Sequence, residues 1–294
     1  MINPPSTSPH PIDVHFEFLS IGILKESRHV VLVALNRPHK RNAINTKMWK
    51  EIGEAFSTLG TIGDGCRCIL VMGIGFGFSA GIDIVDTRFF QNDDADDTAR
   101  QGIALRPQIS EMQRCFTAIE NCPVPVVAAI HGPCIGAGID LACCVDVRLC
   151  SPSTIFSIRE VQLGLAADVG TLQRLPKIIG HGSRIKELCL TGKDFDAQEA
   201  ERIGFVSRVA RNEDDLIQDA TAICKQIAFH SPVAVVGTKL SLNYSRDHSV
   251  QEGLDHIASH NAMAILTDDI AASFSNALEG EQPSFRDLPK HSCL

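Results

Sequence analysis

Three apolar stretches, each followed by a turn or a helix, restrict most strongly what this chain can fold into. HVVLVALNR (29–37) and CRCILVMGI (66–74) have the β-branched character of strands, and the second continues into the glycine-rich GFGFSAGID. A third stretch, VPVVAAIHG (124–132), leads into a second glycine-rich turn, GPCIGAG. Strand, turn and helix return at intervals of about 50 residues, which favours an α/β stack of ββα-like units over one open nucleotide-binding sheet.

Helices are expected between and after these strands. Residues 45–59 predict a helix that begins at an asparagine cap, and residues 98–120 predict another that stops before a proline. Two short strands are expected at 147–150 and 154–158. From Ser183 onward the sequence becomes mostly helical.

The last helical segment, 250–278, has a 3.6-residue apolar rhythm that predicts one buried stripe. The stripe consists of Leu254, Ile257, Ala258, Ala262, Ile265 and Leu266. The chain is therefore divided into a flexible N-terminal arm (1–14), a core (15–205) and a C-terminal helical region (206–294). Such a helical tail after an α/β core is suited to oligomerisation.

Composition and charge exclude several classes of function. The chain has 294 residues, and its 27 Lys and Arg against 35 Asp and Glu argue against a nucleic-acid partner, which needs clustered basic residues. Eleven cysteines without a C-x-x-C pair predict free thiols in a reducing compartment and no zinc site. Neither a membrane span nor a secretory signal or transit peptide is expected.

The loop at 75–83 carries competing patterns. Gly75-x-Gly77-x-x-Ala80 imitates a dinucleotide fingerprint, but no long helix is expected directly after it. Gly77-x-Ser79-x-Gly81 fits the nucleophile turn of a hydrolase, with Ser79 as the attacking group. In a third interpretation the glycines let a ligand approach backbone N–H groups, and the turn at 132–138 offers the same facility before a helix.

Three acids lie near these loops in apolar, glycine-flanked surroundings. Asp140, Glu160 and Asp168 fall within 29 residues of one another. A carboxylate is costly to bury without a partner, so each is either a structural cap or ion-pair member, or a group with a shifted pKa at a functional site.

Four motifs together resemble the crotonase, or enoyl-CoA hydratase/isomerase, superfamily. They are NRPHKRNAIN (36–45), FSAGIDI (78–84), PVVAAIHGPCIGAGIDLACCVDVRLC (125–150) and REVQLGLAADVGTLQRLP (159–176). The last motif and SPVAVVGTKLSLNYSRDHSV (231–250) are most similar to the Δ3,5-Δ2,4-dienoyl-CoA isomerases. The resemblance implies a crotonase-type spiral of ββα units, a homo-oligomer (trimer or hexamer), an acyl-CoA substrate and no metal or further cofactor.

The resemblance also implies roles for individual residues. The backbone N–H groups of Ile82 and Ala137 would form the oxyanion hole, and Ala137 stands where the family usually has glycine. Asp140 and Glu160 occupy the positions of the paired glutamates of hydratases, and Asp168 that of an additional acid. Residues expected to contact the substrate or its CoA are Arg41, Ala80, Gly81, Asp83, Ile84 and Gly138.

The expected reaction moves a 3,5-diene into conjugation with the thioester. Glu160 would take the C2 proton, Asp168 would protonate C6, and Asp140 would tune the protonation of Glu160. The alternatives are a 2-enoyl-CoA hydratase on the same scaffold and the Ser79-dependent hydrolase. The C-terminal Ser292-Cys293-Leu294 resembles the peroxisomal S-K-L signal, so a peroxisome is expected, with mitochondrion or cytosol as alternatives.

Overall fold

A seven-stranded sheet forms the centre of the molecule. The computed structural model describes residues 2–10, 15–59, 65–85, 97–279 and 282–289. Along the sheet the strands are β1 (Thr7–Pro9), β2 (Leu19–Leu24), β3 (Val30–Leu35), β4 (Cys68–Gly73), β5 (Val126–Ile130), β7 (Val147–Cys150) and β10 (Arg208–Val209). From β3 to β10 neighbouring strands are parallel, and every residue of β3, β4 and β5 is buried. Strands covered on both faces need uninterrupted apolar sequence, which these strands have.

A second, three-stranded sheet consists of β6 (Pro133–Ile135), β8 (Ile155–Ser157) and β9 (Phe195–Asp196). The chain passes from β5 to β6 and then into helix α3 (Ala137–Cys144). It repeats this step from β7 to β8, followed by the 3-10 helix η3 (Glu160–Leu163) and α4 (Thr171–Ile179). The predicted α/β fold built from repeating ββα units is therefore confirmed.

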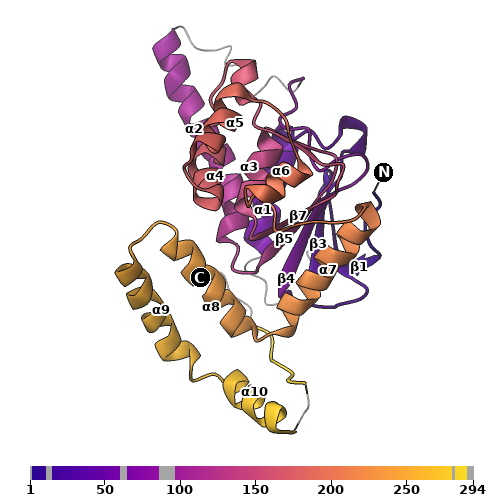
Figure 1. Cartoon of the computed structure of the whole chain (residues 1–294), viewed down its shortest axis with the longest axis vertical. Coiled ribbons are helices and arrows are strands. Elements are labelled where there is room, and N and C mark those ends of the chain that lie inside the picture. The colour runs from indigo at the N-terminus through magenta and orange to yellow at the C-terminus, as the bar shows by residue number, and fades with distance from the viewer. Residues whose placement is uncertain (1, 11–14, 60–64, 86–96, 280–281, 290–294) are drawn as a thin grey trace.

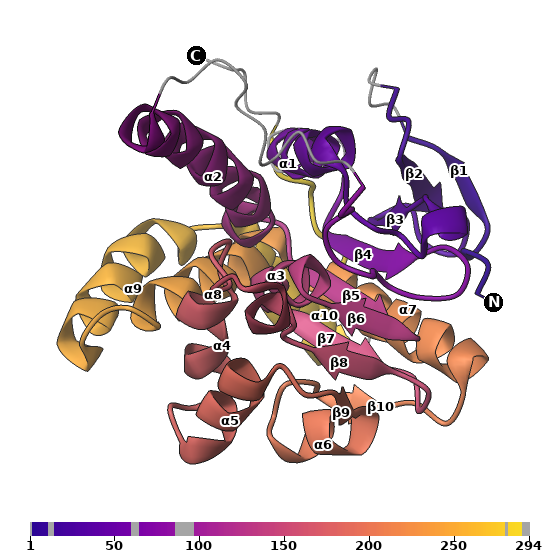
Figure 2. The same cartoon turned by 90° about the horizontal axis from the view of Figure 1, so that it is seen from above.

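Helices cover both faces of the central sheet (Figures 1 and 2). On one face α1 (Thr46–Leu59) and α2 (Thr98–Asn121) pack together around one apolar core, whereas α7 (Glu213–Phe229) packs on the other face. The Asn45 side chain accepts a hydrogen bond from the Met48 N–H at 2.9 Å, as expected of the predicted cap. The remaining short helices are η1 (Pro38–Lys40), α5 (Ser183–Thr191) and α6 (Ala197–Arg202).

The C-terminal helices extend beyond this core (Figure 1), and the first of them is joined to it by the salt bridge between Lys239 and Asp146. They are α8 (Pro232–Ser245), α9 (Val250–Ala264) and α10 (Asp268–Glu279). The predicted single helix over 250–278 is thus interrupted at residues 265–267, and its predicted buried stripe is wrong for the single chain. Leu254, Ile265 and Leu266 are 55%, 64% and 81% exposed, because α9 packs against α8 and projects away from the sheet.

The expected divisions of the chain correspond only in part to these layers. Strand β1 pairs with β2, and Ile2 is buried and exchanges backbone hydrogen bonds with Gly75, so residues 2–9 of the expected arm lie against the core. Residues 11–14 lie outside the described residues. Both β10 and α7 belong to the core although they follow residue 205, and the projecting part begins at α8. Within the described ranges, no helix is long and apolar enough to span a bilayer.

Candidate active site

Two glycine-rich loops meet at the end of the central sheet. The Ser79 N–H donates to the Pro133 carbonyl, and the Ile135 N–H donates to the Ser79 carbonyl, each at 3.0 Å. Gly81 has a φ of +91°, and a Cβ on it would lie 2.8 Å from the Ile135 carbonyl oxygen and 3.6 Å from the Ala137 nitrogen. Only glycine allows this approach, which places Ile82 and Ala137 next to each other.

The N–H groups of Ile82 and Ala137 are both available at this junction. Ile44 bonds to Gly81 and Asp83 on either side of Ile82, so the Ile82 N–H points away from that bridge. Ala137 is the first residue of α3, where N–H groups have no partner inside the helix. Within the described residues neither N–H has an acceptor. Two unpaired N–H groups side by side are suited to binding an oxyanion.

Asp140 lies one turn into α3 and is completely buried. Its Oδ1 accepts a hydrogen bond from the Thr171 N–H at 2.6 Å, whereas its Oδ2 has no partner among the described residues. Burial raises the pKa of Asp140 to about 7; its contacts with Thr171 oppose this rise, and the charges of Glu160 and Asp168 add to it. The side chain is therefore partly protonated near neutral pH.

Glu160 follows β8 and points at the turn that precedes Ala137. A Cβ on Gly136, whose φ is +51°, would lie 3.2 Å from the Glu160 Oε1. Glu160 Oε2 has no partner within the described part of the chain. Burial raises the pKa of Glu160, and the negative charge of Asp168 adds to the effect. A carboxyl with a raised pKa beside an oxyanion site is suited to act as a general base.

Asp168 lies on the loop between η3 and α4 and is exposed. Its backbone carbonyl accepts a hydrogen bond from Gln113 Nε2 on α2 at 2.6 Å. Partial burial raises the pKa of its carboxyl. The three predicted acids therefore influence one another electrostatically, although they lie on three different segments.

Ser79 takes a different place from the one a hydrolase needs. Its hydroxyl is completely buried, donates to the Asn42 carbonyl at 2.9 Å and accepts from the Gly81 N–H at 3.2 Å. A catalytic serine on a nucleophile turn exposes its hydroxyl to substrate. The geometry contradicts the hydrolase alternative and gives the Ser79 hydroxyl the role of fixing its own loop to the segment at Asn42.

The residues expected to contact substrate or CoA lie around the same junction, in different environments. Ala80 and Gly138 belong to the two loops, and a Cβ on Gly138 would lie 3.1 Å from the Ser79 carbonyl oxygen. Ile84 and Arg41 are exposed. The Asp83 carboxylate is buried and paired with Arg37 at 3.0 Å.

Arg37 changes how the basic sequence at 37–41 is interpreted. The sequence leaves open whether these residues form a solvated turn or a seat for phosphates. Arg37 is buried against Asp83 and lies 5.0 Å from the centroid of the Phe18 ring, so it does not belong to an exposed basic cluster. His39, Lys40 and Arg41 are exposed.

Two residues that hold the acids were not singled out from the sequence. Thr171 supplies the N–H that binds Asp140, and Gly136 makes room for Glu160. One signal for Thr171 was present: α4 begins after Gly170, which has no side chain to cap the helix, so its N–H groups need an acceptor from elsewhere.

The chain is similar to several known proteins. The protein family described as Enoyl-CoA hydratase/isomerase matches residues 25–288. The mitochondrial Δ(3,5)-Δ(2,4)-dienoyl-CoA isomerase of Mus musculus is 45% identical over 273 residues, covering 92% of this chain and 83% of the relative. The peroxisomal enzyme of that name from Arabidopsis thaliana is 40% identical over 256 residues, covering 86% and 91%. An enoyl-CoA hydratase structure from Bacillus anthracis superposes with a TM-score of 0.83 at 26% identity, covering 92% and 99%.

Proposed function

The chain belongs to the enoyl-CoA hydratase/isomerase family, and on that premise we propose that it converts 3,5-dienoyl-CoA into 2,4-dienoyl-CoA in fatty-acid β-oxidation. One observation carries the choice of reaction within the family. Burial raises the pKa values of Asp140, Glu160 and Asp168, and the charge of Asp168 adds to the rise at the other two. Asp140 lies on the helix that begins at Ala137, and Glu160 lies against the turn that precedes it. Hydration uses two acids. A third acid is needed only when one carbon loses a proton and a distant carbon gains one.

The oxyanion site stabilises the intermediate. The thioester oxygen of the substrate accepts hydrogen bonds from the N–H groups of Ile82 and Ala137, and these bonds strengthen as negative charge develops on it. Each such donor contributes roughly 10²–10³ in rate. Ala137 serves as well as glycine here, because the donor is the backbone.

Two proton transfers complete the reaction. Glu160 removes a proton from C2, and the electron pair moves into the carbonyl to form a dienolate. When the pair returns, the double bonds shift from C3 and C5 to C2 and C4, and Asp168 delivers a proton to C6. C2 and C6 are separated by three carbons, so one carboxyl cannot serve both. No oxidation state changes, so we propose that the reaction needs no cofactor other than the CoA of the substrate.

Asp140 acts through Glu160 in this scheme. Its complete burial keeps it from the substrate, and the negative charge of Glu160 helps to raise its pKa to about 7. In the proposed scheme Asp140 therefore holds a proton, and Glu160 is the carboxyl that acts as the base.

The assembly and the compartment are proposals of the same kind. The exposed apolar side chains of α9 support a homo-oligomer, trimeric or hexameric, in which a neighbouring subunit covers them. The mouse relative is mitochondrial and the Arabidopsis relative is peroxisomal. We propose an organelle, and a peroxisome in particular. Ser292-Cys293-Leu294 lies outside the described residues. Imaging a tagged chain with and without these three residues tests the compartment.

The decisive experiment offers the purified protein 3,5-dienoyl-CoA and 2-enoyl-CoA separately. We expect the absorbance of a conjugated diene to grow with the first substrate. Asp168→Asn should lower this rate by about 10²–10⁴-fold, while calorimetric binding of a saturated acyl-CoA stays within a few-fold of wild type. Turnover of 2-enoyl-CoA alone would replace the isomerase by the hydratase.

A further inference from the structure

One face of α2 binds the segment that carries Asp168, the exposed one of the three acids. Gln113, Thr117 and Glu120 are spaced four and three residues apart, so they lie on the same face of the helix. Gln113 donates to the Asp168 carbonyl at 2.6 Å. Thr117 and Glu120 both bind Arg174, at 3.0 Å and 2.9 Å. Together these three side chains form the α2 polar face.

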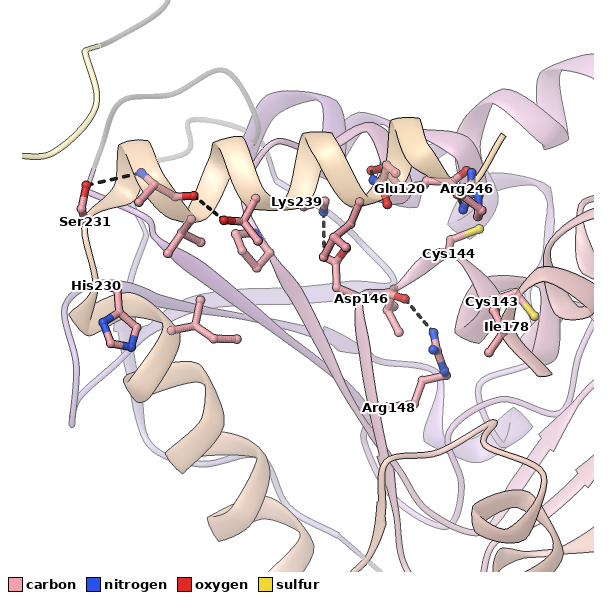
Figure 3. A pocket seen from close by; sticks show the side chains of 18 of the residues that line it. Glu120, Cys143, Cys144, Asp146, Arg148, Ile178, His230, Ser231, Lys239 and Arg246 are labelled. Carbon is pink, nitrogen blue, oxygen red and sulfur yellow. Dashed lines mark hydrogen bonds and ion pairs between the residues drawn. The ribbon is translucent and has the colours of Figure 1, made fainter. Parts of the chain in front are cut away.

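Glu120 is the buried charge of the α2 polar face. Its Oε2 binds Arg174 and its Oε1 binds Arg246, which comes from the end of α8. Figure 3 shows Glu120 and Arg246 side by side at one end of a cavity of about 710 Å³ between α8 and the central sheet. Burial by itself would raise the pKa of Glu120, but the hydrogen bonds and charges of the two guanidinium groups hold it below its ordinary value.

Arg174 connects Glu120 to the turn that precedes α4. Its N–H donates to the Gly170 carbonyl at 2.9 Å. Its Nη1 lies at the point that a Cβ on Gly170 would occupy, so the guanidinium fills the space that glycine leaves. The salt bridge to Glu120 thus fixes a group pressed directly against this turn.

The turn joins two of the three acids. Asp168 precedes Gly170 by two residues, and the Thr171 N–H that follows donates to Asp140 at 2.6 Å. Asp140 lies three residues after Ala137 on α3, so a shift of the turn changes the surroundings of both acids. Movements of about 1 Å can cost as much as 10²-fold in rate when they misplace reacting groups.

We propose that Glu120 is a positioning residue for the reaction: through Arg174 it fixes the turn at 168–171, and so holds the Asp168 carboxyl and the hydrogen bond to Asp140 in place. Glu120 touches neither the reacting carbons nor the oxyanion. The inference rests on the proposed isomerase function for its kinetic test, and a second test on the turn itself is independent of that function.

The kinetic test compares the two arms of the Glu120 carboxylate. Arg174→Met breaks the arm to α4, and we expect kcat for 3,5-dienoyl-CoA to fall by roughly 10-fold to 10²-fold with KM within about threefold of wild type. Arg174→Lys keeps the charge and should restore part of kcat; it also serves if Arg174→Met does not fold. Arg246→Met is the matched control, because it breaks the other arm of the same carboxylate and leaves the Asp247–Lys177 ion pair to α4 in place.

The independent test measures amide hydrogen exchange at Thr171 in each variant. We expect faster exchange in Arg174→Met and Glu120→Gln, and unchanged exchange in Arg246→Met. The Arg174→Met, Glu120→Gln double variant should lose no more kcat than the worse single variant, because the Glu120–Arg174 salt bridge is already broken in each single variant. Wild-type kcat in Arg174→Met, or equal losses in Arg174→Met and Arg246→Met, would overturn the proposal. A wild type inactive on dienoyl-CoA would overturn only the proposed function, and exchange at Thr171 would still decide the positioning role.

Discussion

Replacing Asp140 by asparagine should stabilise the fold, by an amount that grows with pH. The pKa of this carboxyl is about 7 in the folded chain against an ordinary value of 3.8. Between these two values the folded state holds a proton that the unfolded state has released. The free energy of unfolding therefore falls as pH rises, by ~1.4 kcal/mol per pH unit, and becomes constant above the folded pKa.

Over the whole range between the two pKa values, about three pH units, the free energy of unfolding falls by about 4 kcal/mol. Between about pH 5 and about pH 8 the Asp140 carboxyl of the folded state keeps its proton until the pH approaches 7. The free energy of unfolding of wild type should therefore fall by ~2.7 kcal/mol over this range, and that of Asp140→Asn should not. Asparagine retains an oxygen for the Thr171 N–H and carries no charge. Water does not screen the charge of this carboxyl, because the Asp140 side chain is completely buried.

Urea unfolding of both proteins at the two pH values, at one protein concentration, measures this difference. Glu54→Gln removes an exposed carboxyl from α1 and serves as the control for the loss of one negative charge. Acids that do not interact with Asp140 titrate in the same way in both proteins and cancel in the comparison. A stability gap between Asp140→Asn and wild type that is the same at both pH values would refute the reasoning.

Three further substitutions test the site. Ser79→Ala should leave more than half of the turnover while lowering stability by ~1–2 kcal/mol in urea unfolding, since the hydroxyl only fixes its loop to the Asn42 carbonyl; complete inactivity would revive the hydrolase. Gly136→Ala should lower kcat at least 10-fold in the diene assay, because a Cβ would meet the Glu160 Oε1 at 3.2 Å and the backbone there has positive φ. Asp83→Asn should lower the free energy of unfolding by ~3 kcal/mol, because it leaves the buried Arg37 without its counter-ion; an unchanged urea midpoint contradicts this.

A cost to stability at Asp140 is consistent with its place in the proposed reaction. The charged form of a buried carboxyl is destabilised, and the same burial gives the carboxyl a pKa near neutrality. Such pKa shifts are concentrated at functional sites, where groups exchange protons at the working pH. The expected gain from asparagine and the expected role of the acid have one physical cause.

The sequence alone determined the fold class and the positions of the strands around the site. The strands at β3, β4 and β5 are continuous apolar runs, and the glycines after β4 and β5 allow backbone conformations that other residues rarely adopt. These signals are local, so they can be recognised before any contact is known. The ordered motifs that resemble the family fixed the candidate acids for the same reason.

Only the tertiary structure decided how those residues are held. The Asp140 carboxyl binds an N–H 31 residues away, and Glu120 binds arginines 54 and 126 residues away. Whether Ser79 is buried, whether Arg37 turns inward, and whether the stripe on α9 is covered all depend on such distant pairings. A local pattern indicates which interactions a side chain can make. The path of the chain between two distant residues decides which partner the side chain meets.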